Sequence, residues 1–311
     1  MIPSTVGASP EEATDRHAPG RFRVWWLAIR PKTLPAAASG VIVGTVLAWR
    51  DGGFSLGPAL AALAIALLLQ IGSNLANDVY DDERGADTED RLGPLRVTQA
   101  GLLRRDQVKS GMKVVFVLAF VLGVYLTWVR GPMVLVIGVA AIISAIAYTG
   151  GPYPLGYHGL GEVFVFVFFG LASVVGTYWV QTGQTSSLAW LMAVPVGLLI
   201  TAIIVVNNLR DIEQDRAVGK RTVTVRIGTN ATKIEYATLL VVAYATVILA
   251  VAAKALPPTA LVVLFSAPLA YRTTRGVFTQ AGRPLNRALA GTGQTTLAFS
   301  ALFALGMLLA G

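Results

Sequence analysis

Apolar residues gather in long stretches along the chain, separated by shorter polar segments. A helix needs about 20 consecutive apolar residues to cross a bilayer, and several of the stretches approach this length. The pattern predicts an all-α integral membrane protein, a bundle of about nine transmembrane helices. The candidate spans are Leu34–Trp49, Leu56–Ala76, Val114–Val129, Met133–Tyr148, Val163–Val180, Leu188–Val206, Tyr236–Ala253, Ala255–Tyr271 and Ala288–Ala310.

The N-terminal part of the chain departs from this pattern of long apolar stretches. The first span is short, and the segment Phe22–Ile29 extends it if the chain kinks at Pro31 or Pro35. Residues 1–20 are polar and contain Pro and Gly, so we expect a disordered N-terminal tail. Residues 21–311 then form one transmembrane domain.

Composition agrees with a membrane protein and limits the chemistry of any site. The chain is 54% hydrophobic and only 14% charged, whereas soluble domains carry roughly 25% charged residues. It has no Cys and two His. Disulfides and thiolate metal sites are therefore excluded, and any bound metal must be held by oxygen ligands.

Basic residues are distributed unevenly between the predicted loops. With nine spans and a cytoplasmic N-terminus, every Lys and Arg falls on the cytoplasmic side except Arg50, Arg130 and Lys254. This asymmetry is what the positive-inside rule requires, so it predicts a C-terminus on the opposite side. It also explains the net charge of +8, and no nucleic-acid partner is expected.

Two acidic clusters follow apolar helices at the same predicted end of the bundle. The first runs from Asn77 to Asp87, and the second from Asn207 to Asp215. Asn77 and Asp81 are four residues apart and share a helix face, as do Asp211 and Asp215 in the second cluster. Gly85 breaks the first helix and lets Asp87 turn back.

Acidic clusters at one depth repel each other unless a positive charge lies between them. Carboxylate and amide oxygens suit Mg²⁺, which commonly bridges carboxylates to substrate phosphates. Nearby basic residues can hold the same phosphate oxygens. The alternative for one such cluster is a solvated loop, but two matching clusters favour a metal-diphosphate site at the cytoplasmic mouth of a helical bundle.

At these residues the sequence resembles the UbiA superfamily of membrane prenyltransferases. That family has an Asn-x-x-x-Asp motif after its second helix and an Asp-x-x-x-Asp motif after its sixth. In the branch that acts on 1,4-dihydroxy-2-naphthoate, a third acid follows the second by six residues, which is Asp87 here; the benzoate branch places it at the position of Gly85. Four further segments resemble the naphthoate branch: Arg30–Pro35, Gly93–Gly101, Tyr148–Tyr157 and Asn207–Arg216.

The resemblance implies a helical bundle around a central cavity, embedded in the cell membrane and capped by cytoplasmic loops. It implies transfer of a polyprenyl group from its diphosphate to 1,4-dihydroxy-2-naphthoate, with loss of CO₂ and diphosphate. The product would be demethylmenaquinol, an intermediate of menaquinone biosynthesis. Mg²⁺ is the implied cofactor.

The resemblance also assigns expected roles to individual residues. The metal ligands would be Asn77, Asp81, Asp87, Asp211 and Asp215, and the four aspartates among them would be the catalytic residues. Separately from the motif match, basic residues near the acidic clusters and tyrosines whose rings can stabilise a cation are expected to contact substrate: Arg30, Arg84, Arg91, Lys220, Arg221, Tyr148 and Tyr153.

Two alternatives remain open from the sequence. One is a prenyltransferase of the same family with another acceptor, such as 4-hydroxybenzoate. The other, from a different class, is a membrane transporter, although transporters place their acidic residues near the membrane midplane.

Overall fold

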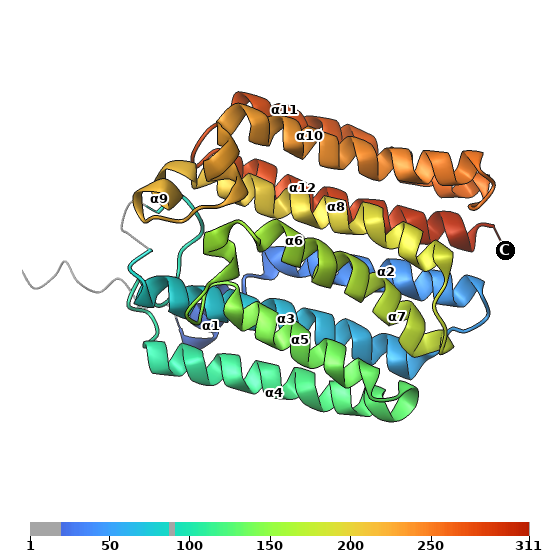
Figure 1. Cartoon of the computed structure of the whole chain (residues 1–311), viewed down its shortest axis with the longest axis horizontal. Coiled ribbons are helices and arrows are strands. Elements are labelled where there is room, and N and C mark those ends of the chain that lie inside the picture. The colour runs from blue at the N-terminus through green and yellow to red at the C-terminus, as the bar shows by residue number, and fades with distance from the viewer. Residues whose placement is uncertain (1–19, 87–90, 311) are drawn as a thin grey trace, which may run out of the picture.

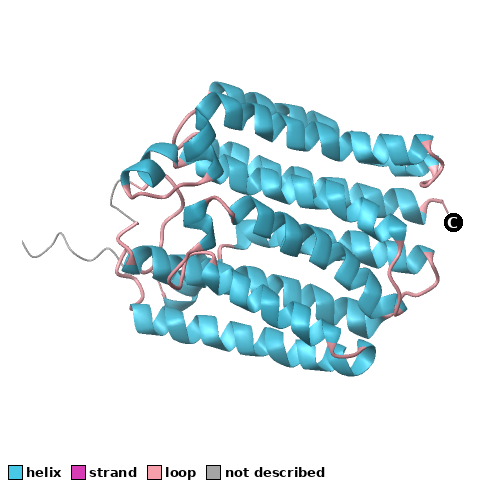
Figure 2. Ribbon diagram, viewed as in Figure 1, coloured by secondary structure: helices cyan, strands magenta, loops and turns pink. Residues whose placement is uncertain are grey.

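The protein is a bundle of helices, seen in a computed structural model that describes residues 20–86 and 91–310. No strand occurs in the described part of the chain (Figure 2). In chain order (Figure 1) the elements are α1 (Arg21–Ile29), η2 (Pro31–Thr33), α2 (Leu34–Arg50), α3 (Leu56–Glu83), α4 (Arg105–Arg130), α5 (Met133–Ala147), η3 (Leu155–His158), α6 (Gly161–Val165), η4 (Phe166–Ala172), α7 (Ser173–Thr182), α8 (Ser187–Arg210), α9 (Ile212–Ala217), α10 (Val223–Ala252), η5 (Pro258–Ser266), α11 (Ala267–Thr279) and α12 (Leu285–Leu308).

The all-α membrane architecture expected from the sequence is confirmed. In the part of the chain that the structure describes, seven helical segments are long and apolar enough to cross a membrane, among them Arg21–Arg50 and Gly161–Thr182, each built from more than one element. The other two expected spans differ from a full apolar helix. α5 has only 15 residues, and the eighth span is divided between η5 and α11. The predicted count of nine is therefore approximate.

The first span bends one residue before the expected proline. Arg30 has a left-handed backbone conformation (φ 54°) between α1 and η2. The residue before a proline is disfavoured in the right-handed helical region, so Pro31 breaks the helix at its predecessor. The extension of the first span across a kink is thus confirmed.

The two helices that carry the acidic clusters end differently. α3 continues through Asn77 and Asp81 to Glu83, and Gly85 then adopts φ 66°, as the sequence predicted. α8 ends at Arg210, and Asp211 leaves the helical region before α9 begins. The amide of Asp215 donates to the carbonyl of Asp211 at 2.8 Å, so the two aspartates lie within one helical turn, although α8 does not continue through Asp211 as α3 continues through Asp81.

The long helices lie side by side, with α4 at one edge and α10 and α11 at the other (Figure 1). A large buried apolar cluster joins α2, α7, α8, α10, α11 and α12, and a second joins α1, α3 and α4. Small residues allow close approach within the bundle. A Cβ on Gly170 in η4 would come 2.5 Å from the Cα of Gly197 in α8, so these two backbones touch.

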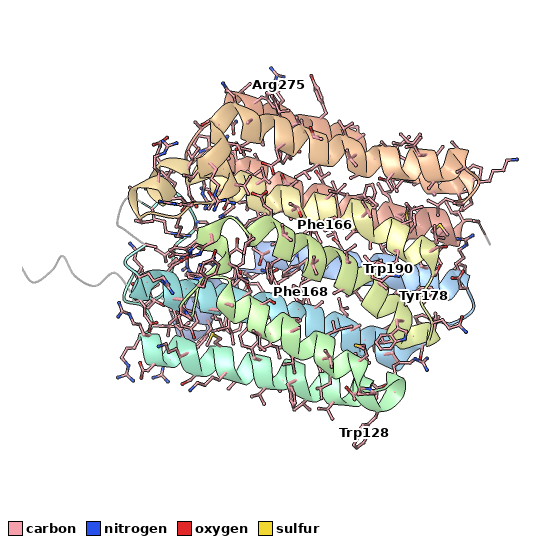
Figure 3. The ribbon with its side chains drawn as sticks, viewed as in Figure 1. Trp128, Phe166, Phe168, Tyr178, Trp190 and Arg275 are labelled. Carbon is pink, nitrogen blue, oxygen red and sulfur yellow. The ribbon has the colours of Figure 1, made fainter. Side chains whose placement is uncertain are left out.

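The two ends of the bundle differ in chemistry. α1 and α9 lie at one end with both acidic clusters, and the chain leaves α12 at the other end (Figure 1). Trp128 projects outward near the far end of α4 and is 87% exposed (Figure 3). An exposed tryptophan near a helix end is typical of the membrane interface.

Candidate active site

A single cavity of about 400 Å³ brings the two acidic clusters together. Its walls come from η2, α2, α3, α4, α5, the segment from α6 to α7, α8 and α12, together with the loops at the charged end. Asn77 and Asp81 line it from α3, and Asp211 and Asp215 line it from the other cluster. The deeper lining is largely apolar, with residues such as Ile65, Leu126 and Val180. The cavity therefore combines a charged end with an apolar interior.

Asp81 is buried at the charged end and accepts hydrogen bonds from three side chains. Its donors are Arg96 at 2.6 Å, the Tyr157 hydroxyl at 2.8 Å and the Lys220 ammonium at 3.3 Å. Charge-assisted bonds of this kind are the stronger ones in proteins. The carboxylate is consequently fixed in position before any ligand binds.

Lys220 bridges the two clusters. Its Nζ lies 3.3 Å from Asp81 and 3.7 Å from Asp215, and it sits 4.5 Å from the ring centroid of Tyr157. The backbone amide of Lys220 donates to the carbonyl of Asp215, which holds the loop after α9 in place. The point between the two carboxylates therefore suits a positive charge.

Asp211 has a different partner. The buried guanidinium of Arg210 donates to both of its oxygens, with Nε 2.7 Å from Oδ1. Arg210 also donates to Asn207 at 3.0 Å and to Asn286 at 2.8 Å. Because Asn286 donates to the carbonyl of Leu92 at 2.8 Å, this network ties the start of α12 to the segment after the first cluster.

Asp78 positions the site without lining the cavity. It is buried and accepts from the backbone amides of Val97 and Thr98 at 3.2 and 3.0 Å. These bonds place the neighbouring Arg96 where it meets Asp81. Arg30 approaches the same carboxylate at 3.8 Å.

The structure separates the expected site residues into two groups. The following line the cavity: Asn77, Asp81, Asp211, Asp215, Arg30, Arg91, Lys220 and Tyr148. Asp87 lies outside the described residues. The other three expected residues do not line the cavity in the part of the chain that the structure describes: Arg84, Arg221 and Tyr153.

Those three residues have other contacts. Arg84 donates to the carbonyl oxygens of Thr149 and Gly151, so it braces the loop after α5. Tyr153 is exposed and stacks on His158, with ring centroids 3.6 Å apart. The backbone amide of Arg221 donates to the carbonyl of Tyr157 at 2.8 Å. The side chains of Arg84 and Tyr153 and the backbone of Arg221 therefore make these contacts, and none of the three residues lines the cavity.

Among the side chains to which the sequence assigned no site role are Tyr157, which donates to Asp81, and Lys32, which lines the cavity. Tyr157 lies four residues after the expected Tyr153, and a tyrosine-rich turn does not reveal which ring faces inward. Lys32 also lines the cavity, two residues after Arg30. Its place in the segment Arg30–Pro35 was the only signal that could have identified it.

Burial raises the pKa of two groups at this end. Desolvation raises the pKa of Asp215 to about 6, while the Lys220 ammonium opposes the shift. Burial and the neighbouring Asp81 carboxylate raise the pKa of Tyr157 above its usual range. Tyr157 therefore keeps its proton and acts as a hydrogen-bond donor.

The residues at this end fit Mg²⁺ by the chemistry of their donors. Asn77, Asp81, Asp211 and Asp215 supply hard oxygen atoms to one end of one cavity. Within residues 20–86 and 91–310, no three acidic or histidine side chains gather closely enough to hold a metal alone. This agrees with the usual way in which Mg²⁺ binds, with few carboxylates and with ligands from water and substrate phosphates.

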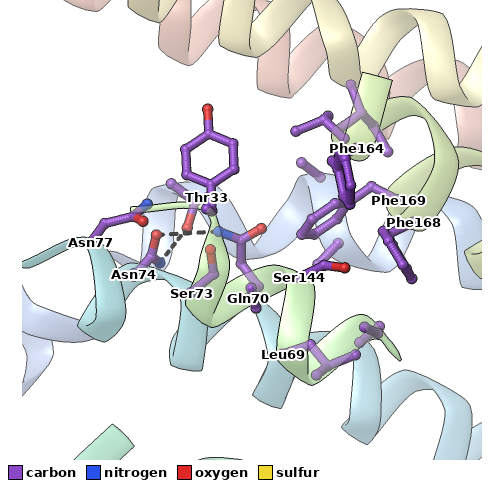
Figure 4. Close-up of a pocket in the computed structure, with 18 of the residues that line it drawn as sticks. Thr33, Leu69, Gln70, Ser73, Asn74, Asn77, Ser144, Phe164, Phe168 and Phe169 are labelled. Atoms are coloured by element: carbon purple, nitrogen blue, oxygen red, sulfur yellow. Dashed lines mark hydrogen bonds between the residues drawn. The ribbon is translucent and has the colours of Figure 1, made fainter. Parts of the chain in front are cut away.

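Below the acids, the cavity has one polar wall and one aromatic wall (Figure 4). On the polar wall, Asn74 donates to the carbonyl of Ile29 and to Thr33, both at 2.9 Å, and accepts from Gln70 at 3.2 Å. Phe164, Phe168 and Phe169 stand on the other side. The arrangement offers hydrogen bonds and ring faces to one bound molecule.

Comparisons with known proteins support a common origin for this architecture. The chain is 36% identical over 298 residues to the 1,4-dihydroxy-2-naphthoate octaprenyltransferase of Haemophilus influenzae, covering 93% of this chain and 97% of that one. It is 44% identical to the enzyme of the same name from Escherichia coli, covering 67% of this chain and 70% of that one. The fold resembles a UbiA homologue from Archaeoglobus fulgidus bound to GPP and Mg²⁺, with a TM-score of 0.65 at 14% identity over 92% of this chain and 99% of that one. The model of the UbiA prenyltransferase family matches residues 37–289, and the chain belongs to that family.

Proposed function

We propose that this protein transfers a polyprenyl group from polyprenyl diphosphate to 1,4-dihydroxy-2-naphthoate, releasing CO₂ and diphosphate and forming demethylmenaquinol. The observation that carries the proposal is the cavity itself, with both acidic motifs at one end and an apolar interior. Relatives that align with most of this chain are named for the same reaction.

The charged end is the proposed diphosphate site. Lys220, Arg91 and Arg30 line it and can donate to phosphate oxygens. Asn77, Asp81, Asp211 and Asp215 would hold Mg²⁺, with Asp87 as a further proposed ligand. When bound, the metal supplies positive charge that neutralises the leaving diphosphate.

The apolar interior is the proposed site of the prenyl chain. α3 lines the cavity from Asp81 to Ala62, a helical distance of roughly 28 Å at 1.5 Å per residue. A long apolar chain can therefore extend from the acids deep into the bundle. The dry walls also keep water from the allylic carbon, and the rings of Tyr148 and Phe164 can stabilise its developing positive charge.

The acceptor ring must lie near the charged end, because its carbon attacks the first carbon of the prenyl chain. The C–O bond to diphosphate breaks as the new C–C bond forms. The carboxylate on the same ring carbon then leaves as CO₂, and its bonding electron pair returns to the ring. The walls shown in Figure 4 suit a flat ring that carries hydroxyl groups.

We also propose that the charged end faces the cytoplasm. The described chain starts at this end and finishes at the other (Figure 1), and the basic loops lie on the cytoplasmic side under the positive-inside rule.

A matched comparison of acceptors tests the proposed function. Purified protein receives one polyprenyl diphosphate, Mg²⁺ and either 1,4-dihydroxy-2-naphthoate or 4-hydroxybenzoate at equal concentration. We expect a prenylated product from the naphthoate and little from the benzoate. Faster prenylation of the benzoate would contradict the assigned acceptor, and absence of diphosphate release with either would contradict a transferase.

A further inference from the structure

The polar wall of the main cavity includes an amide that neither the proposed metal site nor the proposed diphosphate site uses. Gln70 belongs to α3, about two helical turns before Asn77, and its side chain lines the cavity. It donates through Nε2 to Oδ1 of Asn74 at 3.2 Å. The orientation of this amide can be worked out from the hydrogen bonds behind it.

The amide of Asn74 is buried and can face only one way. Thr33 donates its hydroxyl proton to the carbonyl of Arg30 at 2.9 Å, so its oxygen is an acceptor toward Asn74. The carbonyl of Ile29 is also only an acceptor. Both contacts of Asn74, each 2.9 Å long, therefore require its nitrogen. Its oxygen is the atom that meets Gln70.

The orientation of Gln70 follows from that of Asn74. Because Asn74 presents an oxygen, Gln70 must present its nitrogen, and the planar amide turns Oε1 to the other side. Figure 4 shows the Gln70 oxygen pointing away from Asn74, toward the side of the cavity where Phe164 and Phe169 stand. Among the residues that the structure describes, no donor bonds to this oxygen. Gln70 thus presents a fixed acceptor atom to the cavity interior.

Of the proposed substrates, only the aromatic acceptor carries a donor for this atom. The prenyl chain is a hydrocarbon, and an ionised diphosphate has acceptor oxygens alone. The carboxylate of the aromatic acceptor has no proton either. The hydroxyl groups on the ring are therefore the groups that Oε1 of Gln70 can bind.

The two hydroxyls of 1,4-dihydroxy-2-naphthoate are not equivalent. The 1-hydroxyl is next to the carboxylate and donates to it within the molecule, whereas the 4-hydroxyl has no internal acceptor. The depth of Gln70 suits such a contact. Its amide meets Asn74, which precedes Asn77 by a helical rise of roughly 4.5 Å, so a ring bound just below the diphosphate reaches it.

We propose that Gln70 determines acceptor specificity: its Oε1, held in place by Asn74, accepts a hydrogen bond from the 4-hydroxyl of 1,4-dihydroxy-2-naphthoate. The proposal rests on the proposed function, because it assumes this acceptor in this cavity. It adds the side chain that recognises the acceptor and the hydroxyl that is recognised. The 4-hydroxyl is meta to the carbon that is alkylated and donates little electron density to it, so its loss should weaken acceptor binding rather than lower kcat.

Two variants remove the acceptor oxygen, and a third is their control. Gln70→Met keeps the length of the side chain without an amide, and Gln70→Leu is a second apolar replacement that favours a helix. The control is Gln184→Met, the same exchange at an exposed loop residue. Gln184 bonds to Thr182 through its backbone, so the exchange of its side chain keeps these bonds.

The first measurement compares ligands on the wild-type protein. Calorimetry under nitrogen gives the dissociation constants of 1,4-dihydroxy-2-naphthoate and of 1-hydroxy-2-naphthoate, which lacks the 4-hydroxyl. We expect the second ligand to bind about tenfold more weakly, the loss typical of one hydrogen bond. Equal affinities for the two ligands would overturn the proposal. This comparison needs no variant and does not depend on the folding of one.

The second measurement is a cycle between the protein and the ligand. In Gln70→Met and Gln70→Leu, the dihydroxynaphthoate should bind about tenfold more weakly than in wild type, and removal of the 4-hydroxyl should then have no further effect. Removal of the 1-hydroxyl, in 4-hydroxy-2-naphthoate, should weaken binding by the same factor in wild type and in both variants. Independent, additive losses for the 4-hydroxyl as well would show that Gln70 only packs in the wall.

Two controls limit the effect to the acceptor. Gln184→Met should bind the dihydroxynaphthoate as wild type does. The KM for polyprenyl diphosphate should stay within about threefold of wild type in both Gln70 variants, because that substrate carries no donor for Oε1. A KM that rises as much as the dissociation constant of the naphthoate would show a general disturbance of the cavity and would contradict the specific contact.

The outcomes also separate this proposal from the proposed function. A wild-type protein that binds none of the three naphthoates would contradict the assigned acceptor, and the role of Gln70 with it. Naphthoate binding that does not distinguish the ligands with and without the 4-hydroxyl would contradict only the role of Gln70.

Discussion

Asp81 is surrounded by positive and hydrogen-bonding groups that come from distant parts of the chain. Arg96, Tyr157 and Lys220 all donate to it, so the loops after α3, α5 and α9 converge on one carboxylate. A carboxylate fixed by its neighbours binds a ligand with little loss of conformational freedom. Substitution of Asp81 should therefore reduce activity more than substitution of most other residues in the site.

Replacing Asp81 by Asn should reduce kcat by about a hundredfold or more, because it removes a negatively charged oxygen that is proposed to hold the metal at the diphosphate site. The fold should persist, since Arg96 also bonds to the carbonyl of Asn77 and Lys220 also meets Asp215. Asp82→Asn is the matched control, because Asp82 pairs with the exposed Arg105 at 2.5 Å. Turnover of Asp81→Asn close to that of Asp82→Asn would remove Asp81 from the site.

The pKa of Asp215 predicts how activity depends on pH. Because burial raises that pKa to about 6, the carboxylate is ionised above pH 6 and becomes neutral below it. A neutral carboxyl binds Mg²⁺ poorly, so the Mg²⁺ concentration for half-maximal rate should rise as the pH falls through 6. Titrations of Mg²⁺ between pH 5 and pH 8 check this. An equal Mg²⁺ concentration for half-maximal rate at pH 5 and at pH 8 would exclude Asp215 as a metal ligand.

The same shift also affects folding, with a definite sign. The folded state holds the Asp215 proton more tightly than the unfolded chain does. The ionised carboxylate therefore disfavours folding above pH 6, and this unfavourable contribution disappears as the pH falls from 6 toward 3.8.

Among contacts between elements, η4 and α8 pack backbone against backbone at Gly170 and Gly197. Gly170→Leu should force these elements apart and lower the free energy of unfolding by about 1–3 kcal/mol. Gly123→Ala in α4 is the control, because nothing lies within 4 Å of a Cβ there. Denaturation in detergent micelles compares the two. Equal stability would show that η4 and α8 do not pack as closely as described.

Local sequence signals predicted the elements well where one residue determines the conformation. Asn77 and Asp81 share a face of α3, and Gly85 ends the turn with a positive φ, because spacing and glycine are properties of the local chain. The break at Asp211 was missed. Arg210 is held by Asn286, 76 residues away, and this tertiary contact accompanies a change of direction that helical spacing does not indicate.

For the site residues too, local sequence patterns predicted some positions and tertiary contacts determined the others. The acidic motifs predicted which end of the bundle is charged, and Arg30, Arg91, Lys220 and Tyr148 do line the cavity. Arg84, Arg221 and Tyr153 were chosen by proximity in sequence and lie elsewhere. Whether a basic loop residue faces inward depends on contacts such as those of Arg84 with Thr149, which no local pattern contains.

For the whole molecule, the charge distribution and the placement of its ends give a testable topology. We expect Gly20 on the cytoplasmic side and Ala310 on the opposite side, because most basic residues lie in loops at the end of the bundle that holds α1. Reporter fusions at the two termini distinguish the sides. Reporters that are active on the same side would contradict the nine crossings predicted from the sequence.

The cavity is proposed to carry out one reaction, so the most direct measurement follows every product of that reaction. Purified protein is incubated with Mg²⁺, a polyprenyl diphosphate and 1,4-dihydroxy-2-naphthoate labelled with ¹³C in its carboxylate. Mass spectrometry should find a prenylated naphthalenediol without the label and labelled CO₂ in equal amount, and EDTA should abolish both. A product that keeps the labelled carboxylate, or no prenylated product at all, would contradict the account.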